Sequence, residues 1–479
     1  MVGRQDRRQD ELFVACTLRE LIPPDHILRR VNKVLDLGWL RSEVKELYDQ
    51  YQGRPSIDPE SAVRLMLAGF FQGIVHDRKL MREAQVNLAI RWFAGYRLDE
   101  KLPEHSSLTR IRQRWGAERF RRIFQKTVEE CVKAGLVEAE TVHVDATLIR
   151  ADVSWKSLVA RHAEQVIREN PDGPEGGKPP AGKRGRPRTQ EKAPKKVSRT
   201  DPEATLTTSC ASERMEPSYK QHTAVDDRAG VVLDVAVTTG EQSEGEQLLA
   251  QVGRIEANTG ERVTRLTADS GYAHAANYAR LERSEIDAVI PPQKEASRPG
   301  RMPLSRFKYD AKNQRVRCPT GKLLRQSGRE ERGCWYSARR EDCRRCRLRG
   351  RCFGGKQAGR KVLIVEGYEA LLRARRRRAR SSQADRRRYR RHRWRVEGIH
   401  GEAKTQHGLR RAVRRGLWNV AIQAYLTATV MNLKRLAALL FLIFLRESRR
   451  TGRSNCIFAA WGASAGLGHE STISNRLAA

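Results

Sequence analysis

Three acidic residues occupy places where a carboxylate is costly to keep unless something cationic needs it. Asp145 interrupts an apolar, β-branched run at 141–149, and Asp269 closes a second strand-like run. Glu397 stands in the arginine-rich window 389–404. A buried acid needs a partner or a metal, and carboxylates are ligands that Mg²⁺ prefers. The three acids therefore predict a divalent-metal site, provided that the fold brings them together.

The window around Glu397 has helical spacing. Four polar side chains recur there at intervals of three and four residues: Arg393, Glu397, His400 and Lys404. That spacing puts them on one face of a helix. Glu402 is the rival acid, but five residues place it about 140° around the helix from Glu397, so both cannot face the same ions. We expect Arg391, Arg393, His400 and Lys404 to contact the phosphates of a nucleic acid.

The charge of the chain favours the same partner. With 93 Lys+Arg against 57 Asp+Glu, the 479-residue chain has a formal net charge of +36. Such a field concentrates polyanions, so DNA is the expected partner. A basic surface of the ribosomal-extension type remains open on charge alone.

The sequence also indicates where the protein is located and the state of its cysteines. The N-terminal ten residues contain no apolar segment of the secretory type, so we expect a cytoplasmic protein. The longest apolar run, 436–445, is shorter than the ~20 residues of a spanning helix, so no membrane partner is expected. Nine cysteines in that compartment favour free thiols or metal ligands over disulfides.

Residues 1–137 predict an all-helical N-terminal domain. Amphipathic stripes follow Asp25 and the Asp58–Pro59 pair, and a further helix begins at Ser106 or Ser107. Two interpretations are open for this region: a DNA-binding domain of helix-turn-helix style, or an ordinary helical bundle with a polar surface.

From residue 138 the periodicity changes to that of an α/β domain, in two parts at 138–298 and 360–445. Two strand-like runs, 220–225 and 231–237, are joined by a turn and followed by alternating helix and strand patterns. This order predicts a mixed sheet flanked by helices. The second part adds a strand at 361–365, a long basic helix at 371–415 and an apolar helical region. We expect the tail at 446–479 to be flexible.

Two segments interrupt this domain. Residues 165–205 are rich in Pro, Gly and Lys and predict a disordered basic loop. Within it, Arg184 and Arg186 belong to an Arg-Gly-Arg-Pro sequence similar to the minor-groove-binding core of an AT-hook, although a plain linker has the same composition.

The second interruption, 299–359, is loop-like and rich in cysteine. Cys343-x2-Cys346 has the spacing of a metal knuckle, and Cys318 or Cys334 together with Cys352 would complete a four-thiolate zinc site. Free reduced thiols are the alternative. Our preferred ligand set is Cys318, Cys343, Cys346 and Cys352.

At this point the chain resembles a known family. The order Asp145, Asp269, Glu397, with Arg393-x3-Glu397-x6-Lys404 around the last acid, is similar to the DDE core of bacterial insertion-sequence transposases. The branch it resembles has the signature Y-x2-R-x3-E-x6-K. Segments similar to the N-terminal region of the same transposases lie at 54–59, 87–93 and 103–107. One departure is that the signature tyrosine falls on Arg390, with Tyr389 one position early.

The resemblance implies an RNase H-like mixed sheet flanked by helices and preceded by the all-helical domain. Asp145 and Asp269 would hold two Mg²⁺ ions, with Mn²⁺ as an alternative, and Glu397 would complete one site. Arg393 and Lys404 would lie near the scissile phosphate. The implied partners are double-stranded transposon ends, target DNA and a second copy of the chain, in the bacterial nucleoid. A non-catalytic DNA-binding regulator and a structure-selective nuclease are the rival functions.

Overall fold

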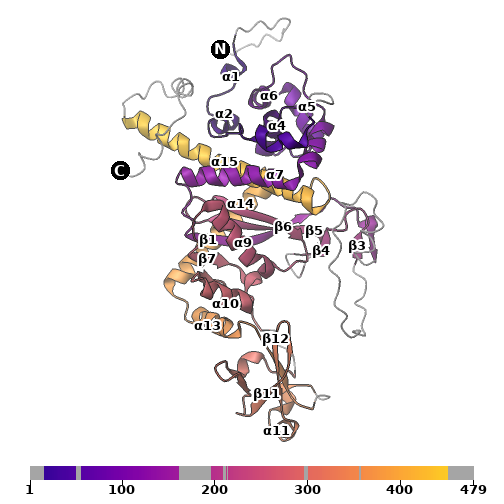
Figure 1. Cartoon of the computed structure of the whole chain (residues 1–479), viewed down its shortest axis with the longest axis vertical. Helices are drawn as coiled ribbons and strands as arrows, with labels where there is room; N and C mark the ends of the chain where they lie inside the picture. The colour runs from indigo at the N-terminus through magenta and orange to yellow at the C-terminus, as the bar shows by residue number, and fades with distance from the viewer. Residues whose placement is uncertain are drawn as a thin grey trace, which may run out of the picture. The chain divides into compact units, whose positions relative to one another are not determined.

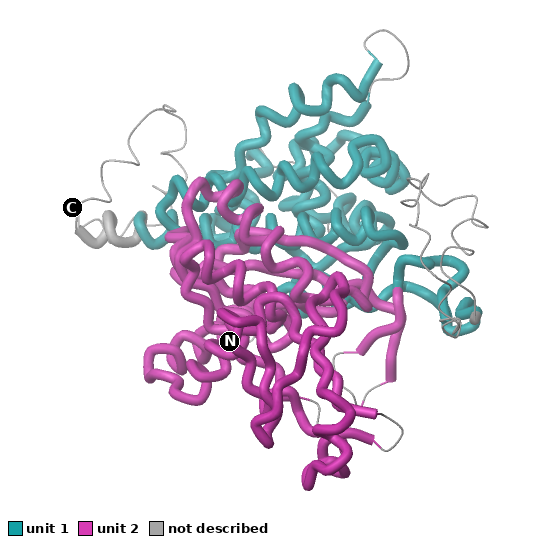
Figure 2. Tube along the Cα trace, turned by 60° about the horizontal axis from the view of Figure 1, so that its bottom comes forward, with its two compact units in different colours: residues 1–136, 149–204, 401–479 teal, residues 137–148, 205–400 magenta. Residues whose placement is uncertain are grey.

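The structure is a computed structural model that describes residues 16–49, 56–160, 196–208, 212, 214–295, 300–354 and 358–450. The chain divides into two compact units (Figure 2). Unit 1 comprises 1–136, 149–204 and 401–479, and unit 2 comprises 137–148 and 205–400. The N-terminal helices therefore share a unit with the C-terminal helix. Most of the predicted disordered loop, with Arg184 and Arg186, and the tail beyond residue 450 lie outside the described residues.

Unit 1 is built mainly of helices (Figure 1). In chain order they are α1 (Leu18–Leu21), α2 (Ile27–Asn32), α3 (Leu40–Val44), α4 (Pro59–Phe71), α5 (Asp77–Val86), α6 (Leu88–Ala94), α7 (His105–Lys133) and α15 (Leu417–Arg450). The start predicted at Asp58–Pro59 is confirmed, because the Asp58 carboxylate accepts a hydrogen bond from the Glu60 amide at 2.8 Å. Helix α7 changes direction at Gly116, whose φ is +67°. A short hairpin of β2 (Leu158–Ala160) and β3 (Lys196–Ser198) completes the described part of the unit.

Helix α15 is the central element of unit 1. Its apolar residues join the N-terminal helices in one hydrophobic core, which includes Trp115, Ile422 and Leu426. Residues 417–443 are long and apolar enough to cross a membrane, yet 56% of the window tested is buried inside the protein. A core helix of a globular protein meets the same criterion, and α15 packs against α7, α2 and α4.

Unit 2 contains the predicted mixed sheet. Its strands are β1 (Thr141–Arg150), β4 (Thr205–Thr207), β5 (Glu216–Asp226), β6 (Val232–Thr239), β7 (Arg265–Ala268) and β8 (Asp287–Val289). The order across the sheet is β4-β5-β1-β7-β8, with β6 also paired to β5. β5 and β6 form an antiparallel hairpin, whereas β1, β7 and β8 are parallel. Asp227, just after β5, donates its backbone N–H to Thr141 at the start of β1, so these two strands run in opposite directions.

Helices cover this sheet. α9 (Glu244–Thr259) connects β6 to β7 and packs on β5 and β6, and α10 (Ala275–Arg283) connects β7 to β8. An antiparallel hairpin followed by parallel strands reached through helices is the RNase H-like arrangement, so the predicted fold class is confirmed. The hydrophobic runs that favoured these strands are buried, as the zero exposure of Val142, Val144 and Leu266 shows.

The cysteine-rich segment is not loop-like, and that expectation is wrong. It forms a five-stranded antiparallel meander of β9 (Lys308–Asp310), β10 (Arg315–Arg317), β11 (Leu323–Glu330), β12 (Gly333–Ala338) and β13 (Lys361–Val365). Short helices α11 (Arg340–Arg344) and α12 (Arg349–Cys352) lie between the last two strands. The strands escaped notice because β9 and β10 have three residues each and the outer half of β11 is exposed and polar.

The basic region after β13 is two helices rather than one. α13 (Tyr368–Ala379) ends before Arg380, and α14 (Gln383–Gln406) begins after the Ser381-Ser382 pair. Serine competes with the helix by bonding locally to the backbone, and the Ser382 hydroxyl accepts a hydrogen bond from the Asp385 amide at 3.0 Å. α14 carries Glu397.

Candidate active site

Strands β1 and β7 bring the two aspartates together. Their parallel register pairs His143 with Thr267 and Val144 with Ala268, and extending it by one residue sets Asp145 opposite Asp269. Adjacent strands are about 4.8 Å apart. The predicted pair thus meets at neighbouring strand positions, at the end of β7 where the chain leaves the sheet.

The pKa of Asp145 is raised by its surroundings. Burial is the largest influence on its pKa, and Asp269, Glu244 and Glu397 add to it, so that the pKa is raised to about 7. A hydrogen bond from the Ala146 backbone acts in the opposite direction. The three neighbouring carboxylates therefore disfavour the charged form of Asp145, and a cation bound among them would remove that repulsion.

Asp269 caps a single 3-10 turn, Ser270–Tyr272. Its Oδ1 accepts the Gly271 N–H at 2.7 Å, which fixes the carboxylate at the strand exit. Glu244, the first residue of α9, lies directly against Gly271, where any added Cβ would meet its Oε2 at 2.0 Å. A side chain at 271 would displace the Glu244 carboxylate, so the absence of a Cβ there lets a fourth carboxylate approach the site.

Glu397 reaches the site from helix α14 and is largely solvent-accessible. Its side chain is 63% exposed, and Arg393, one turn earlier, donates to it at 3.1 Å. Arg393 and Glu397 thus share one face of α14, and Arg393, expected to contact DNA phosphates, is paired with Glu397. Because both side chains are exposed, this ion pair is weak and can exchange for other partners.

His400 is buried beside Asp145. Its Nδ1 lies 3.8 Å from Asp145 Oδ2, and its Nε2 lies 3.2 Å from the Thr223 hydroxyl on β5. The structure therefore places this predicted DNA contact next to an acid, in the interior. Lys404, one turn further along α14, belongs to the part of the helix that is in unit 1.

A chain of buried polar groups holds the three acid-bearing elements together. His143 Nδ1 lies 2.5 Å from the Thr267 hydroxyl, which lies 3.1 Å from His392 Nδ1 on α14. The other ring nitrogen of His143, Nε2, lies 2.8 Å from Asp227 Oδ1. Asp227 also forms an ion pair with Arg391. Burial lowers the pKa of both histidines, that of His392 to about 3, so both rings are neutral at physiological pH. The predicted phosphate contact Arg391 is engaged in this network.

Two tyrosines border the acids. Tyr272 is fully buried, and its hydroxyl has no hydrogen-bond partner within the described part of the chain. Burial, followed by Asp145, Glu244 and Asp269, raises its pKa. Tyr389 stacks on His392 with ring centroids 5.6 Å apart, and its pKa is raised by burial and then by Asp269. Tyr389 therefore lies near the acids although it stands one position before the signature tyrosine.

The carboxylates near Asp145 are suitable ligands for a hard divalent cation, although they do not form a closed metal site. Among the described residues, no three His, Cys, Asp or Glu side chains are close enough to hold a metal ion as they stand. Glu397 is paired with Arg393 on the helix surface. The four carboxylates are nevertheless the kind of oxygen donor that Mg²⁺ or Mn²⁺ would take.

The rival acid Glu402 serves another purpose. Lys434 and Arg435 of α15 donate to it at 2.5 and 3.2 Å, and His407 lies 3.5 Å away. Burial opposes ionisation, but these partners lower the pKa of Glu402 to about 2. Glu402 is an anchoring acid within unit 1.

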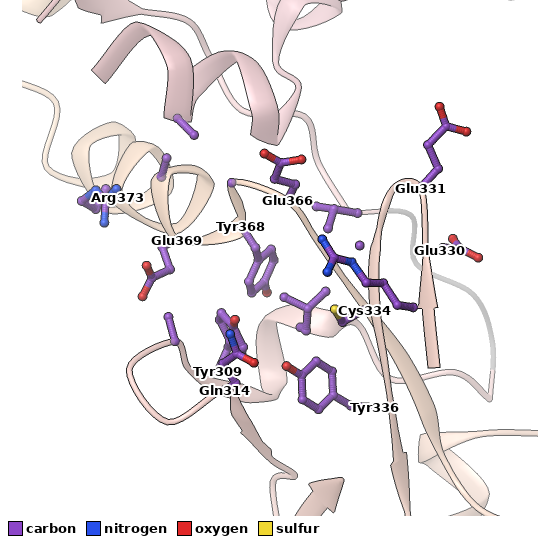
Figure 3. Close-up of a pocket in the computed structure, with 18 residues that line it drawn as sticks. Tyr309, Gln314, Glu330, Glu331, Cys334, Tyr336, Glu366, Tyr368, Glu369 and Arg373 are labelled. Atoms are coloured by element: carbon purple, nitrogen blue, oxygen red, sulfur yellow. The ribbon is translucent and has the colours of Figure 1, made fainter. Parts of the chain in front are cut away.

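The cysteines separate into two groups. Four of them line one cavity of about 30 Å³: Cys318, Cys343, Cys346 and Cys352. Cys334 lies elsewhere, among the residues of a pocket of about 340 Å³ that includes Tyr309, Tyr336 and Tyr368 (Figure 3). The structure thus separates the two candidates, Cys318 and Cys334, that the sequence leaves open.

Sequence reasoning missed Glu244, Tyr272 and the histidine chain. Glu244 looked like the ordinary first residue of a helix, and Tyr272 like part of a strand exit. His143 carried a usable signal, because it stands two residues before Asp145 in an otherwise apolar strand and so faces the same side.

Comparison with known proteins adds to these observations. A model of a transposase domain (DUF772) matches residues 16–114, and a model of a transposase DDE domain matches residues 317–437. The second match includes Glu397 and the cysteine-rich sheet from β11 onward, but neither Asp145 nor Asp269. No curated protein matches. A crystal structure of a pre-cleavage Mos1 transpososome aligns at 12% identity over 50% of this chain and 61% of its own, with a TM-score of 0.17. That score is too low to establish a common fold.

The fold is an RNase H-like mixed sheet flanked by helices. The two transposase-domain matches, which together cover less than half of the chain, support an insertion-sequence DDE transposase.

Proposed function

We propose that the protein binds the terminal inverted repeats of its own insertion sequence, cleaves phosphodiester bonds and joins the freed 3′-OH ends to target DNA. The observation that supports this most directly is the convergence of Asp145, Asp269 and Glu397 from β1, β7 and α14. The pKa of Asp145 is consistent with it, since burial first and then Asp269, Glu244 and Glu397 raise that pKa to about 7.

The proposed ligands of two Mg²⁺ ions, or of Mn²⁺ in their place, are Asp145, Asp269 and Glu397, with Glu244 at their edge. Bound there, the ions would activate the attacking water or 3′-OH and stabilise the charge on the phosphate. Arg393 would leave Glu397 for a backbone phosphate, because both partners are exposed and exchange at little cost. His400, close to Asp145, would receive or return a proton there.

The remaining cations would bind and orient DNA. A net charge of +36 supplies a strong, salt-dependent attraction for the duplex. We assign Arg393 and Lys404 to phosphates near the cleavage point, and Arg184 and Arg186 to flanking DNA. The active complex is proposed to be a homodimer on DNA in the bacterial cytoplasm, with no membrane partner.

The test uses the full chain and duplexes taken from the DNA that flanks its coding region. With Mg²⁺, we expect cleavage at the repeat ends and transfer into a target plasmid. Asp145→Asn should lose cleavage by about 10³-fold or more, as the several kcal/mol of metal-assisted stabilisation imply, while end binding stays within a few-fold. Glu246→Gln is the matched control, because Glu246 is an exposed acid on α9.

Each rival function has its own outcome. Sequence-specific binding with no metal-dependent cleavage by the wild-type chain would indicate a regulator. Cleavage without strand-transfer products would indicate a nuclease. Substantial Mg²⁺-dependent cleavage by Asp145→Asn would exclude Asp145 from the metal site.

A further inference from the structure

The cysteine-rich sheet holds four thiols around one small space. The cavity lined by Cys318, Cys343, Cys346 and Cys352 has a volume of about 30 Å³, on the order of one water molecule. All four cysteines are free thiols, and Cys343 and Cys352 are buried. In the described chain they stand around the cavity without forming a closed metal-binding group. A single ion at its centre would draw them together.

Backbone hydrogen bonds fix the turns that carry Cys318 and the Cys343–Cys346 pair. Cys318-Pro-Thr-Gly321 forms a tight turn in which the Gly321 N–H donates to the Cys318 carbonyl at 2.8 Å and Gly321 has a φ of +86°. At the second pair, the Cys346 N–H donates to the Cys343 carbonyl at 3.3 Å, and the Leu348 N–H donates to Cys346 Sγ at 3.4 Å. An amide directed at sulfur stabilises a thiolate, and such outer-shell bonds orient metal ligands.

A buried cation beside the cavity has no anion to balance it among the described residues. Arg360 lines the same cavity and is 5% exposed. One of its terminal nitrogens donates to the Met302 carbonyl at 2.7 Å and its guanidinium lies 5.4 Å from the Phe307 ring centroid, whereas Nε is buried without a partner in the described chain. A buried charge without a counter-ion is expensive. Four thiolates around a divalent ion carry a net charge of −2, which would supply that counter-ion.

The local fold also needs a cross-link. The core of this sheet is small and includes Cys343 and Cys352 themselves. Helices α11 and α12 have five and four residues, too few to be stable alone. A metal held by the β10–β11 turn, by α11 and its following turn, and by α12 would join three pieces of this small core.

We propose that Cys318, Cys343, Cys346 and Cys352 bind one structural zinc ion, with Arg360 as its charge-compensating neighbour. Four S–H bonds break and four Zn–S bonds form, and the four protons go to solvent. Thiolate ligands and a four-coordinate site favour zinc over the hard cations of the carboxylate site. This proposal is independent of DNA cleavage, because it concerns a separate ligand set.

The experiment measures metal in the full-length protein purified under reducing conditions. We expect about one zinc ion per chain by mass spectrometry of the metal content. Cys343→Ser with Cys346→Ser should lose it, whereas Cys334→Ser, from the same sheet but another pocket, should retain it. Arg360→Met should weaken zinc affinity by roughly 10- to 100-fold, the usual cost of losing an outer-shell partner.

A second measurement does not depend on any variant folding. Wild-type protein stripped of zinc and given Co²⁺ should develop the intense near-ultraviolet absorption of cobalt–thiolate bonds, and zinc should abolish it. Purified wild-type chain without zinc and without that absorption would overturn the proposal. Loss of zinc in Cys334→Ser equal to that in the double variant would overturn the ligand assignment. These readouts stay informative even if no DNA cleavage is found.

Discussion

The two ends of helix α14 use the same residue type in opposite ways. Glu397, in the part that belongs to unit 2, is 63% exposed and pairs only weakly with Arg393. Glu402, in the part that belongs to unit 1, is 18% exposed and is held by Lys434 and Arg435. A carboxylate that is already ion-paired with two cations cannot bind a metal ion without breaking those ion pairs. The candidate metal ligand is therefore distinguished by a carboxylate that is exposed and only weakly paired, whereas the anchoring residue is already held by two cations.

The comparison is tested most strongly by Glu397→Gln. The amide keeps the size of the side chain but removes its charge, so DNA cleavage should fall by about 10³-fold, the several kcal/mol expected of a lost metal ligand. Thermal stability should hardly change, because the exposed pair with Arg393 contributes little. Cleavage assays and thermal unfolding of the same preparation measure both. A marked fall in stability would mean that Glu397 also anchors the helix.

The next test concerns the part of α14 in unit 2, which is positioned against β7 by His392. His392→Leu removes the bond to Thr267 that ties α14 to β7, and we expect cleavage to fall by roughly 10- to 100-fold, as for other outer-shell partners. His392→Asn can replace the Nδ1 contact and should recover most of that activity. Equal losses in both variants, measured by single-turnover cleavage, would contradict a positioning role.

Glu402→Gln should act on stability instead. Breaking a buried ion pair costs about 3 kcal/mol or more, and the partial exposure of Glu402 reduces this to roughly 2 kcal/mol. The pKa of Glu402 is lowered to about 2, so its contribution is complete above the unfolded pKa near 4.5. It disappears as pH falls from there towards 2. Denaturant unfolding at pH 7, 5 and 3 should show the wild type losing its advantage over Glu402→Gln, while cleavage by the folded variant at pH 7 stays within a few-fold.

Much of the fold could be predicted from periodicity. The strand at 361–365 and the helix start at Asp58–Pro59 were located exactly, because apolar spacing and local start signals determine them. Both aspartates were expected in strand-like runs, and the parallel register sets Asp269, just after β7, opposite Asp145 within β1. Glu244 and Tyr272 could not be found in this way, because their nearness to the acids depends on a close approach at Gly271. The meander at 308–365 was missed since its shortest strands are too short for a period to show.

The wide separation of the acids along the chain has a consequence for the timing of synthesis. Asp269 precedes Glu397 by 128 residues, and the cysteine-rich sheet lies between them. A ribosome adding about 5 to 20 residues per second therefore needs roughly 6 to 25 seconds to pass from the second acid to the third. Until α14 emerges, the nascent chain contains only two of the three acids of the proposed metal site. On the proposed function, it therefore cannot cleave DNA during most of its translation.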